Sequence, residues 1–262
     1  MVAVENVAKS KLEAGDLVLG VGLRQSRTVD VGKAMKLAGF DWLFIDLEHN
    51  SMHIDTASQI AVAALDAGIA PILRVPGFEQ HHAARALDGG AQGIVFPHVD
   101  DAETAARLAS YCRYPPDGRR SMTGALPQLG FATHSTDDVV AAMNDTTLVV
   151  MMIESAEAVA NAEAIAAVPG VDVLLIGTND LCIELGIPGQ YEHQMVIDAY
   201  QSVIAACRKH GKHPAMGGIY KPETAAPYIN MGMRMILCGS DLAFMMAGGR
   251  AAASGMRAAI NS

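Results

Sequence analysis

The stretch at residues 148–154 reads Leu-Val-Val-Met-Met-Ile-Glu, six consecutive apolar residues followed by one carboxylate. A run that is apolar at every position is typical of a parallel strand buried on both faces. Seven further short runs have near-continuous apolar interiors, at residues 17–23, 41–47, 70–75, 93–96, 171–177, 213–219 and 235–239. The sequence therefore predicts eight parallel strands.

Amphipathic segments separate these runs and predict helices. They lie at residues 28–38, 54–66, 79–88, 101–111, 155–168, 194–210 and 222–230, and a last one begins near Asp241. Eight strands that alternate with helices favour a closed (β/α)8 TIM barrel over an open doubly wound sheet. The length of 262 residues suits one such barrel, so we expect a single domain spanning residues 1–262.

Composition excludes several classes of protein. The net charge is −9 and no run of Lys or Arg occurs, which argues against a nucleic-acid partner. No apolar stretch approaches the length of a membrane span, and the first 16 residues do not resemble a signal peptide. The four cysteines are scattered without C-x-x-C spacing, which indicates a reducing compartment. We expect a cytoplasmic protein that contacts neither nucleic acid nor membrane.

One connection departs from the regular alternation. Residues 113–147 form a link of about 35 residues that contains Pro115, Pro116, Gly118, Gly124 and Gly130. A connection of this length in a compact domain is usually a working loop or a contact with a partner. Residues 137–143 are expected to form a short helix within it.

Polar residues follow the predicted strands at their carboxyl ends, where TIM barrels build their active sites. Glu154 and Asp180 each come after a buried strand. An isolated buried charge is costly, so such a carboxylate is either paired or bound to a cation. Two carboxylates completed by water and substrate oxygens suit Mg²⁺ or Mn²⁺. The alternative is that Asp180 caps a helix and Glu154 forms a salt bridge.

Two further rim residues have candidate roles. Arg74 ends the third predicted strand, and its planar guanidinium suits bidentate capture of a substrate carboxylate, although it could instead pair with a rim acid. His49 could serve as a general base, with Asp46 fixing its tautomer, or it could be structural. Gly177 and its neighbours Thr178 and Asn179 could let backbone groups approach a substrate anion, although tight turns explain such glycines equally well.

Several motifs in the same order resemble the class II pyruvate aldolases of the 4-hydroxy-2-oxoheptanedioate aldolase group, within the citrate lyase β-like superfamily. The resemblance covers nearly the whole chain. It rests on residues 38–49 (AGFDWLFIDLEH), 72–76 (ILRVP), 87–93 (LDGGAQG), 114–118 (YPPDG), 152–155 (MIES) and 176–181 (IGTNDL).

The resemblance implies a role for each matching residue. Glu154 and Asp180 correspond to the metal ligands, with Mg²⁺ or Mn²⁺ expected and Co²⁺ or Zn²⁺ as alternatives. Arg74 corresponds to the arginine that orients the 2-oxo acid and stabilises its enolate. His49, held by Asp46, corresponds to the base that works through a water molecule. Pyruvate or hydroxypyruvate would be the donor and an aldehyde the acceptor.

The resemblance also implies self-association. Asp88 corresponds to an acid that reaches the histidine of a neighbouring subunit, and members of this family are typically hexamers built from two trimers that exchange the last helix. Residues 242–256, rich in Ala and Met, are the candidate for that helix, although they could equally pack on their own barrel.

Two features depart from the family pattern. Met152 stands where relatives often carry a glutamine, and the loop at residues 118–131 lacks the usual Gly-x-Arg-Gly run and has Phe131 in place of a common Trp. This loop borders the acceptor in the family, so the acceptor aldehyde stays open.

Three alternatives to a metal-dependent aldolase are weighed. A Schiff-base aldolase needs a lysine on a strand end, and Lys221, two residues beyond the seventh predicted strand, comes nearest. A CoA-ester lyase of the citryl-CoA or malyl-CoA type should display basic residues for the CoA phosphates. A catalytically silent barrel would be free to lose the rim residues.

Overall fold

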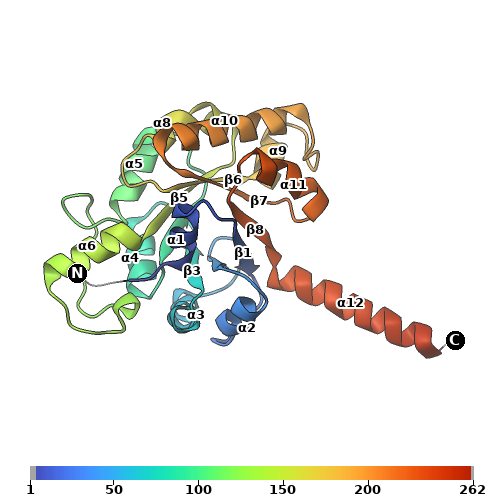
Figure 1. Ribbon diagram of the computed structural model, residues 1–262, viewed down its shortest axis with the longest axis horizontal. Coiled ribbons are helices and arrows are strands. Elements are labelled where there is room, and N and C mark those ends of the chain that lie inside the picture. The colour runs from blue at the N-terminus through green and yellow to red at the C-terminus, as the bar shows by residue number, and fades with distance from the viewer. Residues whose placement is uncertain (1–3, 261–262) are drawn as a thin grey trace.

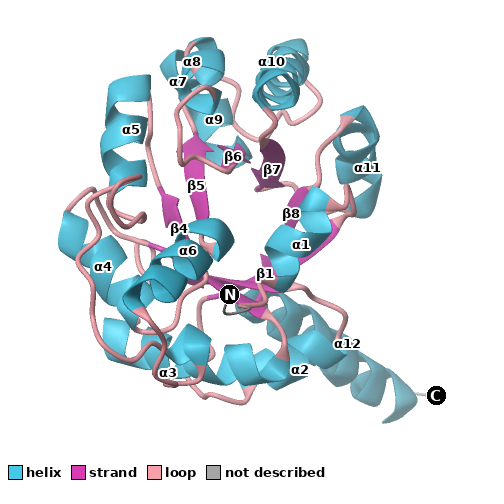
Figure 2. Ribbon diagram, turned by 60° about the vertical axis from the view of Figure 1, so that its left-hand side comes forward, coloured by secondary structure: helices cyan, strands magenta, loops and turns pink. Residues whose placement is uncertain are grey.

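Eight parallel strands close into a barrel in the order of the sequence. Figure 2 shows the strands surrounded by helices. The computed structural model describes residues 4–260. The strands are β1 (Val18–Leu23), β2 (Trp42–Asp46), β3 (Ala70–Arg74), β4 (Gly93–Phe96), β5 (Leu148–Ile153), β6 (Val173–Gly177), β7 (His213–Gly217) and β8 (Met235–Ser240). The predicted TIM barrel is confirmed, and all eight apolar runs become strands.

The helices mostly follow the amphipathic segments and surround the barrel (Figure 1). They include α2 (Val31–Leu37), α3 (Ile54–Ala67), α4 (Gln80–Asp88), α5 (Ala102–Ser110), α10 (Gln194–His210) and α11 (Pro222–Met231). The segment expected at residues 155–168 is instead two short helices, α7 (Ala156–Ala160) and α8 (Ala162–Ala166). They meet at Asn161, whose side-chain amide donates to the Asp100 carbonyl. A further short helix, α9 (Thr178–Glu184), directly follows β6.

A helix that periodicity did not predict, α1 (Val7–Glu13), packs against the barrel interior. Its Ala8 and Leu12 are buried in the same apolar cluster as Trp42 of β2. Gly20 of β1 makes room for this indole, because a Cβ at that position would overlap the ring. Each large apolar side chain buried in this way stabilises the fold by about 1.5–3 kcal/mol.

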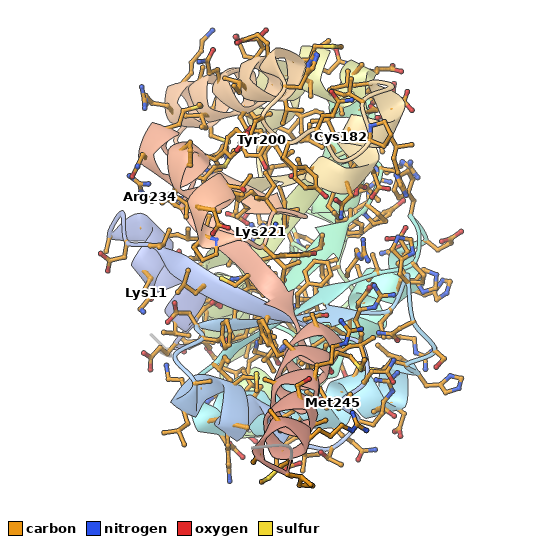
Figure 3. All side chains as sticks on the ribbon, turned by 90° about the vertical axis from the view of Figure 1, so that its right-hand side faces the viewer. Lys11, Cys182, Tyr200, Lys221, Arg234 and Met245 are labelled. Carbon is orange, nitrogen blue, oxygen red and sulfur yellow. The ribbon has the colours of Figure 1, made fainter. Side chains whose placement is uncertain are left out.

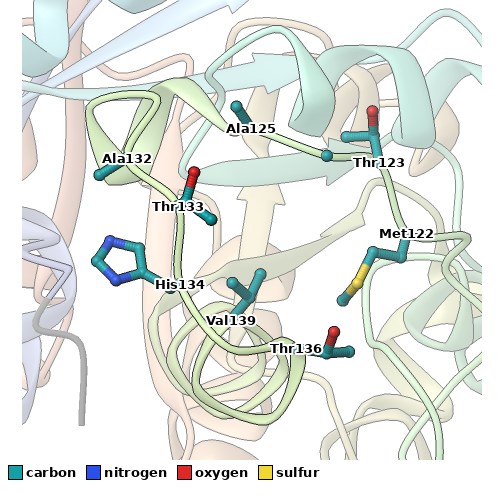
Figure 4. A pocket seen from close by; sticks show the side chains of 9 residues that line it. Met122, Thr123, Ala125, Ala132, Thr133, His134, Thr136 and Val139 are labelled. Atoms are coloured by element: carbon teal, nitrogen blue, oxygen red, sulfur yellow. The ribbon is translucent and has the colours of Figure 1, made fainter.

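The long connection folds over one side of the barrel and has its own small core. It contains the 3-10 helix η1 (Pro127–Leu129) and α6 (Thr136–Thr146), which is longer than the predicted helix at residues 137–143. The buried residues of this core are Tyr114, Leu126, Leu129, Val139 and Met143. Residues 122–125 and residues between 132 and 139 line a cavity of about 430 Å³, and Figure 4 shows their side chains around it. Its lining shares no residue with the cavity at the barrel rim.

The last helix, α12 (Asp241–Ile260), projects away from the barrel (Figure 1). None of its described residues is buried, and Figure 3 shows Met245 on its surface. Only its beginning touches the barrel, where Phe244 stacks on Phe40 with ring centroids 6.0 Å apart. None of the helices in the described part of the chain combines the length and hydropathy needed to cross a membrane.

Candidate active site

A cavity of about 150 Å³ opens at the carboxyl ends of the strands. Seven of the residues predicted for the site line it: His49, Arg74, Glu154, Gly177, Thr178, Asn179 and Asp180. Asp46 lies beside Arg74 rather than on the cavity wall, and Asp88 lies elsewhere on the chain. The larger cavity in the long connection is lined by neither carboxylates nor arginines, so the charged chemistry gathers at the rim.

Arg74 is buried at the base of this cavity and is held by two carboxylates. The β2–β3 register places Asp46 opposite Arg74, and the two side chains form a bidentate pair, with Nε donating to Oδ1 at 2.9 Å and Nη2 donating to Oδ2 at 2.7 Å. Nη1 lies 3.0 Å from Glu48 Oε2. Burial opposes a charged Asp46, but the hydrogen bond and charge of Arg74 hold its pKa below the ordinary value. The guanidinium is therefore fixed in direction before any substrate binds.

The expected contact between Asp46 and the His49 imidazole is not formed. The Asp46 carboxylate accepts the backbone N–H groups of Glu48 and His49, at 3.0 and 3.2 Å, besides its bonds with Arg74. The His49 side chain is 52% exposed, and its Nε2 lies 3.7 Å from Glu48 Oε2. Asp46 thus positions His49 through the backbone, because the register commits its carboxylate to Arg74.

Glu154 is almost fully buried, with 3% of its side chain exposed. Its Oε2 accepts the His98 backbone N–H at 3.1 Å and lies 3.4 Å from His98 Nδ1. No Lys or Arg forms an ion pair with it among the described residues. Burial, together with the charge of Asp180, raises the pKa of Glu154 to about 7, despite opposing contributions from His98 and Arg74. A carboxylate in this state is a good ligand for a cation.

Gly177 explains how Glu154 fits at this place. A Cβ on Gly177 would overlap the Glu154 carboxylate, so the absence of a side chain makes room for the acid. The backbone there has φ of −85°, which any residue can adopt. Close approach, rather than a turn, is the reason for glycine at this position.

The first turn of α9 carries the other predicted residues. Gly177 is the residue before this helix, so Asp180 is not its N-cap. Asp180 is exposed and lines the cavity together with Glu154. Asn179 Oδ1 accepts a hydrogen bond from the Tyr191 hydroxyl at 2.8 Å. Thr178 is buried and donates to the Gly217 carbonyl at 2.6 Å, so its side chain links β6 to β7.

Among the described residues, no lysine or arginine forms an ion pair with either of the two carboxylates at this rim. The arrangement is therefore compatible with binding of a divalent cation. In the described part of the chain, no group of three or more His, Cys, Asp or Glu side chains forms a complete ligand set. Mg²⁺ commonly uses one or two carboxylates and completes its shell with water and substrate oxygens. The residues present therefore fit such an ion and a chelating substrate.

Asp88 ends α4 and contacts the long connection rather than the cavity. Arg120 Nη2 lies 2.8 Å from Asp88 Oδ1, and the buried Arg120 guanidinium stacks on the Tyr114 ring at 4.6 Å. The Asp88 side chain is 34% exposed. Asp88 thus forms an ion pair within its own chain and is partly exposed.

Sequence reasoning missed three polar neighbours of the site. His98 has a left-handed backbone, with φ of 52°, and turns its imidazole to within 3.3 Å of Glu48 Oε1. Its position two residues beyond β4 was a usable signal, because the other rim residues follow their strands in the same way. Arg24 follows β1 directly and also lines the cavity. Glu48 belongs to the motif at residues 38–49 but received no role from the pattern alone.

Comparisons with known proteins identify the family of this chain. The pattern of the HpcH/HpaI aldolase/citrate lyase family matches residues 25–247. The chain belongs to this family. It is 41% identical over 249 residues to the 4-hydroxy-4-methyl-2-oxoglutarate aldolase tasA of Hapsidospora irregularis, a match that covers 92% of this chain and 91% of the relative.

Two other members of the HpcH/HpaI family extend the comparison. The hydroxypyruvate/pyruvate aldolase of Paraburkholderia phytofirmans is 33% identical over 260 residues, or 96% of this chain and 98% of the relative. The crystal structure of an HpcH/HpaI aldolase from Desulfitobacterium hafniense superposes with a TM-score of 0.91 at 28% identity, covering 97% of each chain. The prediction of a carbon–carbon lyase of the aldolase type is thereby confirmed.

Lys221, the lysine nearest to a Schiff-base position, lies outside the site. It precedes α11 and is exposed, as Figure 3 shows. No lysine in the described part of the chain lines the rim cavity. The structure thus offers no amine for a covalent adduct with a bound oxo acid there.

Proposed function

We propose that this chain catalyses the reversible aldol cleavage of 4-hydroxy-2-oxo acids, with pyruvate or hydroxypyruvate as the 2-oxo acid released. The observation that carries the proposal is the cavity that joins a prepositioned Arg74 with the two carboxylates Glu154 and Asp180. The relatives named as a 4-hydroxy-4-methyl-2-oxoglutarate aldolase and a hydroxypyruvate/pyruvate aldolase support this choice of substrates.

Glu154 and Asp180 would hold a divalent cation, Mg²⁺ or Mn²⁺ in preference to Co²⁺ or Zn²⁺. When bound, the cation supplies positive charge for the oxygen of the substrate's keto group. The chain's own residues orient the substrate and transfer its protons. Arg74 binds the oxo acid and stabilises negative charge on the enolate oxygen, while Asp46 and Glu48 hold its guanidinium in place. His49, exposed at the mouth, takes the proton of the C4 hydroxyl group as the C3–C4 bond breaks and C4 becomes the acceptor carbonyl, and it returns a proton to C3 of the enolate.

Residues 177–179 line the same cavity as Arg74. Gly177 ends β6, and Thr178 and Asn179 begin α9. We propose that these three residues shape the substrate pocket, since Gly177 accommodates the Glu154 carboxylate and Thr178 anchors the wall through Gly217. Met152 lies against Arg74, with Sδ 4.0 Å from Nη1, so a soft apolar neighbour replaces the amide common in relatives.

We propose a homohexamer of two trimers that exchange α12. Two observations support this assembly. None of the described residues of the apolar helix α12 is buried, and the Asp88 side chain is partly exposed. In such an assembly Asp88 would approach His49 of another subunit. We also propose one catalytic domain over residues 1–262 and a cytoplasmic location, which the four free cysteines suit.

The test is release of pyruvate from a panel of 4-hydroxy-2-oxo acids by the purified protein, with and without Mn²⁺ or Mg²⁺. We expect turnover that EDTA abolishes and that added metal restores. Glu154→Gln should lower kcat/KM by at least about 10²-fold, whereas Lys221→Ala should retain activity. Activity that survives exhaustive chelation, or a borohydride-trapped covalent adduct, would contradict the proposal. Cleavage of CoA esters in its place would favour the CoA-ester lyase.

A further inference from the structure

Arg24 is a cation at the mouth of the rim cavity that the proposed reaction leaves without a role. It follows β1, is exposed and lines the same cavity as Arg74 and Glu154. Its Nη2 donates to the His49 carbonyl at 2.9 Å. Among the described residues, no carboxylate lies within ion-pair distance of its guanidinium, and no other side-chain hydrogen bond occupies it.

The placement of Arg24 is built into the fold from a distant part of the chain. Asp241, the first residue of α12, accepts three consecutive backbone N–H groups of the β1–α2 loop, those of Arg24, Gln25 and Ser26, at 2.9, 2.9 and 2.6 Å. The loop is thus anchored through its backbone. The Arg24 side chain donates to the His49 carbonyl and lines the cavity.

Arg74 and Arg24 differ in the charged groups that surround them at the cavity. Arg74 is already paired with Asp46 and lies close to Glu48, and it serves the 2-oxo acid that is released. Arg24 pairs with neither of these carboxylates. An anion can therefore bind to Arg24 without breaking an ion pair within the protein. A guanidinium presents a planar fork that matches a carboxylate. The cavity, at about 150 Å³, favours a compact anion.

We propose that Arg24 binds a carboxylate on the acceptor half of the substrate. The preferred substrates are then 4-hydroxy-2-oxo dicarboxylic acids, and the acceptor is a carbonyl compound that itself carries a carboxylate rather than a neutral aldehyde. This inference rests on the proposed aldol reaction and names the substrate class of the same site.

The experiment compares two substrates that both release pyruvate, 4-hydroxy-2-oxoglutarate and 4-hydroxy-2-oxopentanoate, in which a methyl group replaces the acceptor carboxylate. The wild-type protein should prefer the dicarboxylate in kcat/KM. In Arg24→Met the ratio of the two kcat/KM values should fall about 10- to 100-fold, the loss expected for a hydrogen bond to a charged group. The ratio for Arg24→Lys should lie between those of the wild-type protein and Arg24→Met.

The matched control is Arg27→Met on the same loop, because Arg27 donates to the Ser26 carbonyl and does not line the cavity. It should leave the ratio unchanged. A wild-type protein without preference for the dicarboxylate, or an unchanged ratio in Arg24→Met, would overturn the inference. Exchange of pyruvate methyl protons with D₂O, followed by NMR, requires only the enolate half-reaction. Exchange without a preference for the dicarboxylate would therefore overturn this inference alone. The absence of both exchange and cleavage would overturn the proposed function together with this inference.

Discussion

At the scale of single residues, the side chain that matters most is Glu154. Its charge is buried, its neighbours are a backbone N–H and a half-exposed histidine, and Asp180 adds a second negative charge to the same cavity. Burying an acid in this way costs folding free energy unless a cation compensates. The site is thus expected to be a strained part of the metal-free protein.

That strain predicts a dependence of stability on pH. The pKa of Glu154 is raised to about 7 from an ordinary 4.5, so the unfolded chain loses this proton at a lower pH than the folded one. The stability from this group is full below about pH 4.5 and is lost as pH rises through 7. We expect the loss to reach about 3 kcal/mol in metal-free protein.

Urea unfolding of EDTA-treated protein across this pH range measures the effect. Glu154→Gln is the matched comparison, because it keeps the shape and removes the titration. The difference between the two curves should grow with pH, and Mg²⁺ at pH 8 should stabilise the wild type more than the variant. Parallel curves without such a difference would contradict the assignment.

At the scale of elements, Arg113 ties the long connection to the barrel. Its buried guanidinium donates to the carbonyls of Asn144, Thr147 and Gly170 at 2.6–3.0 Å and pairs with Asp172 at 2.6 Å. These partners lie next to the beginnings of β5 and β6. One side chain therefore ties the beginning of the connection of about 35 residues to its end.

Replacing this side chain should be costly. We expect Arg113→Met to lower the free energy of unfolding by about 3–5 kcal/mol, because it leaves Asp172 and several carbonyls unpaired in a buried place. Arg119→Met, an exposed arginine on the same connection, should change it by less than about 0.5 kcal/mol. Urea denaturation followed by circular dichroism measures both, and similar values for the two variants would refute the role.

At the scale of the whole molecule, α12 is a long helix none of whose described residues is buried in the single chain. Met245 is 59% exposed and Met256 is 74% exposed, and the helix leaves the barrel after its first turn (Figure 1). A helix with apolar residues all round normally packs against protein. The proposed exchange between subunits supplies such a surface.

Light scattering coupled to size-exclusion chromatography tests this assembly. The wild type should elute with the mass of a hexamer, and the double variant Met245→Glu and Met256→Glu should shift to smaller species with its circular dichroism preserved. Leu37→Glu removes an equally exposed apolar side chain from α2, 91% exposed, and should leave the mass unchanged. A monomeric wild type at micromolar concentration would refute the exchange.

The barrel, and the rim on which the site lies, could be predicted from local sequence patterns. Eight runs without alternation can only be buried on both faces, and the carboxyl ends of parallel strands must meet at one mouth. This is why the order of residues was enough to name Arg74, Glu154 and Asp180. Helix α1 and the break at Asn161 were not predicted, because short segments that are stabilised by long-range contacts show little hydrophobic periodicity.

The pairing of side chains in the site depends on the folded barrel and could not be predicted from sequence patterns. The β2–β3 register gives Asp46 to Arg74 instead of the His49 imidazole, and a backbone turn at His98 brings an unforeseen imidazole to Glu154. Asp241 reaches back 217 residues to place Arg24 at the cavity. Local patterns set which face of an element is buried, but hydrogen bonds between side chains depend on distances that only the closed barrel defines.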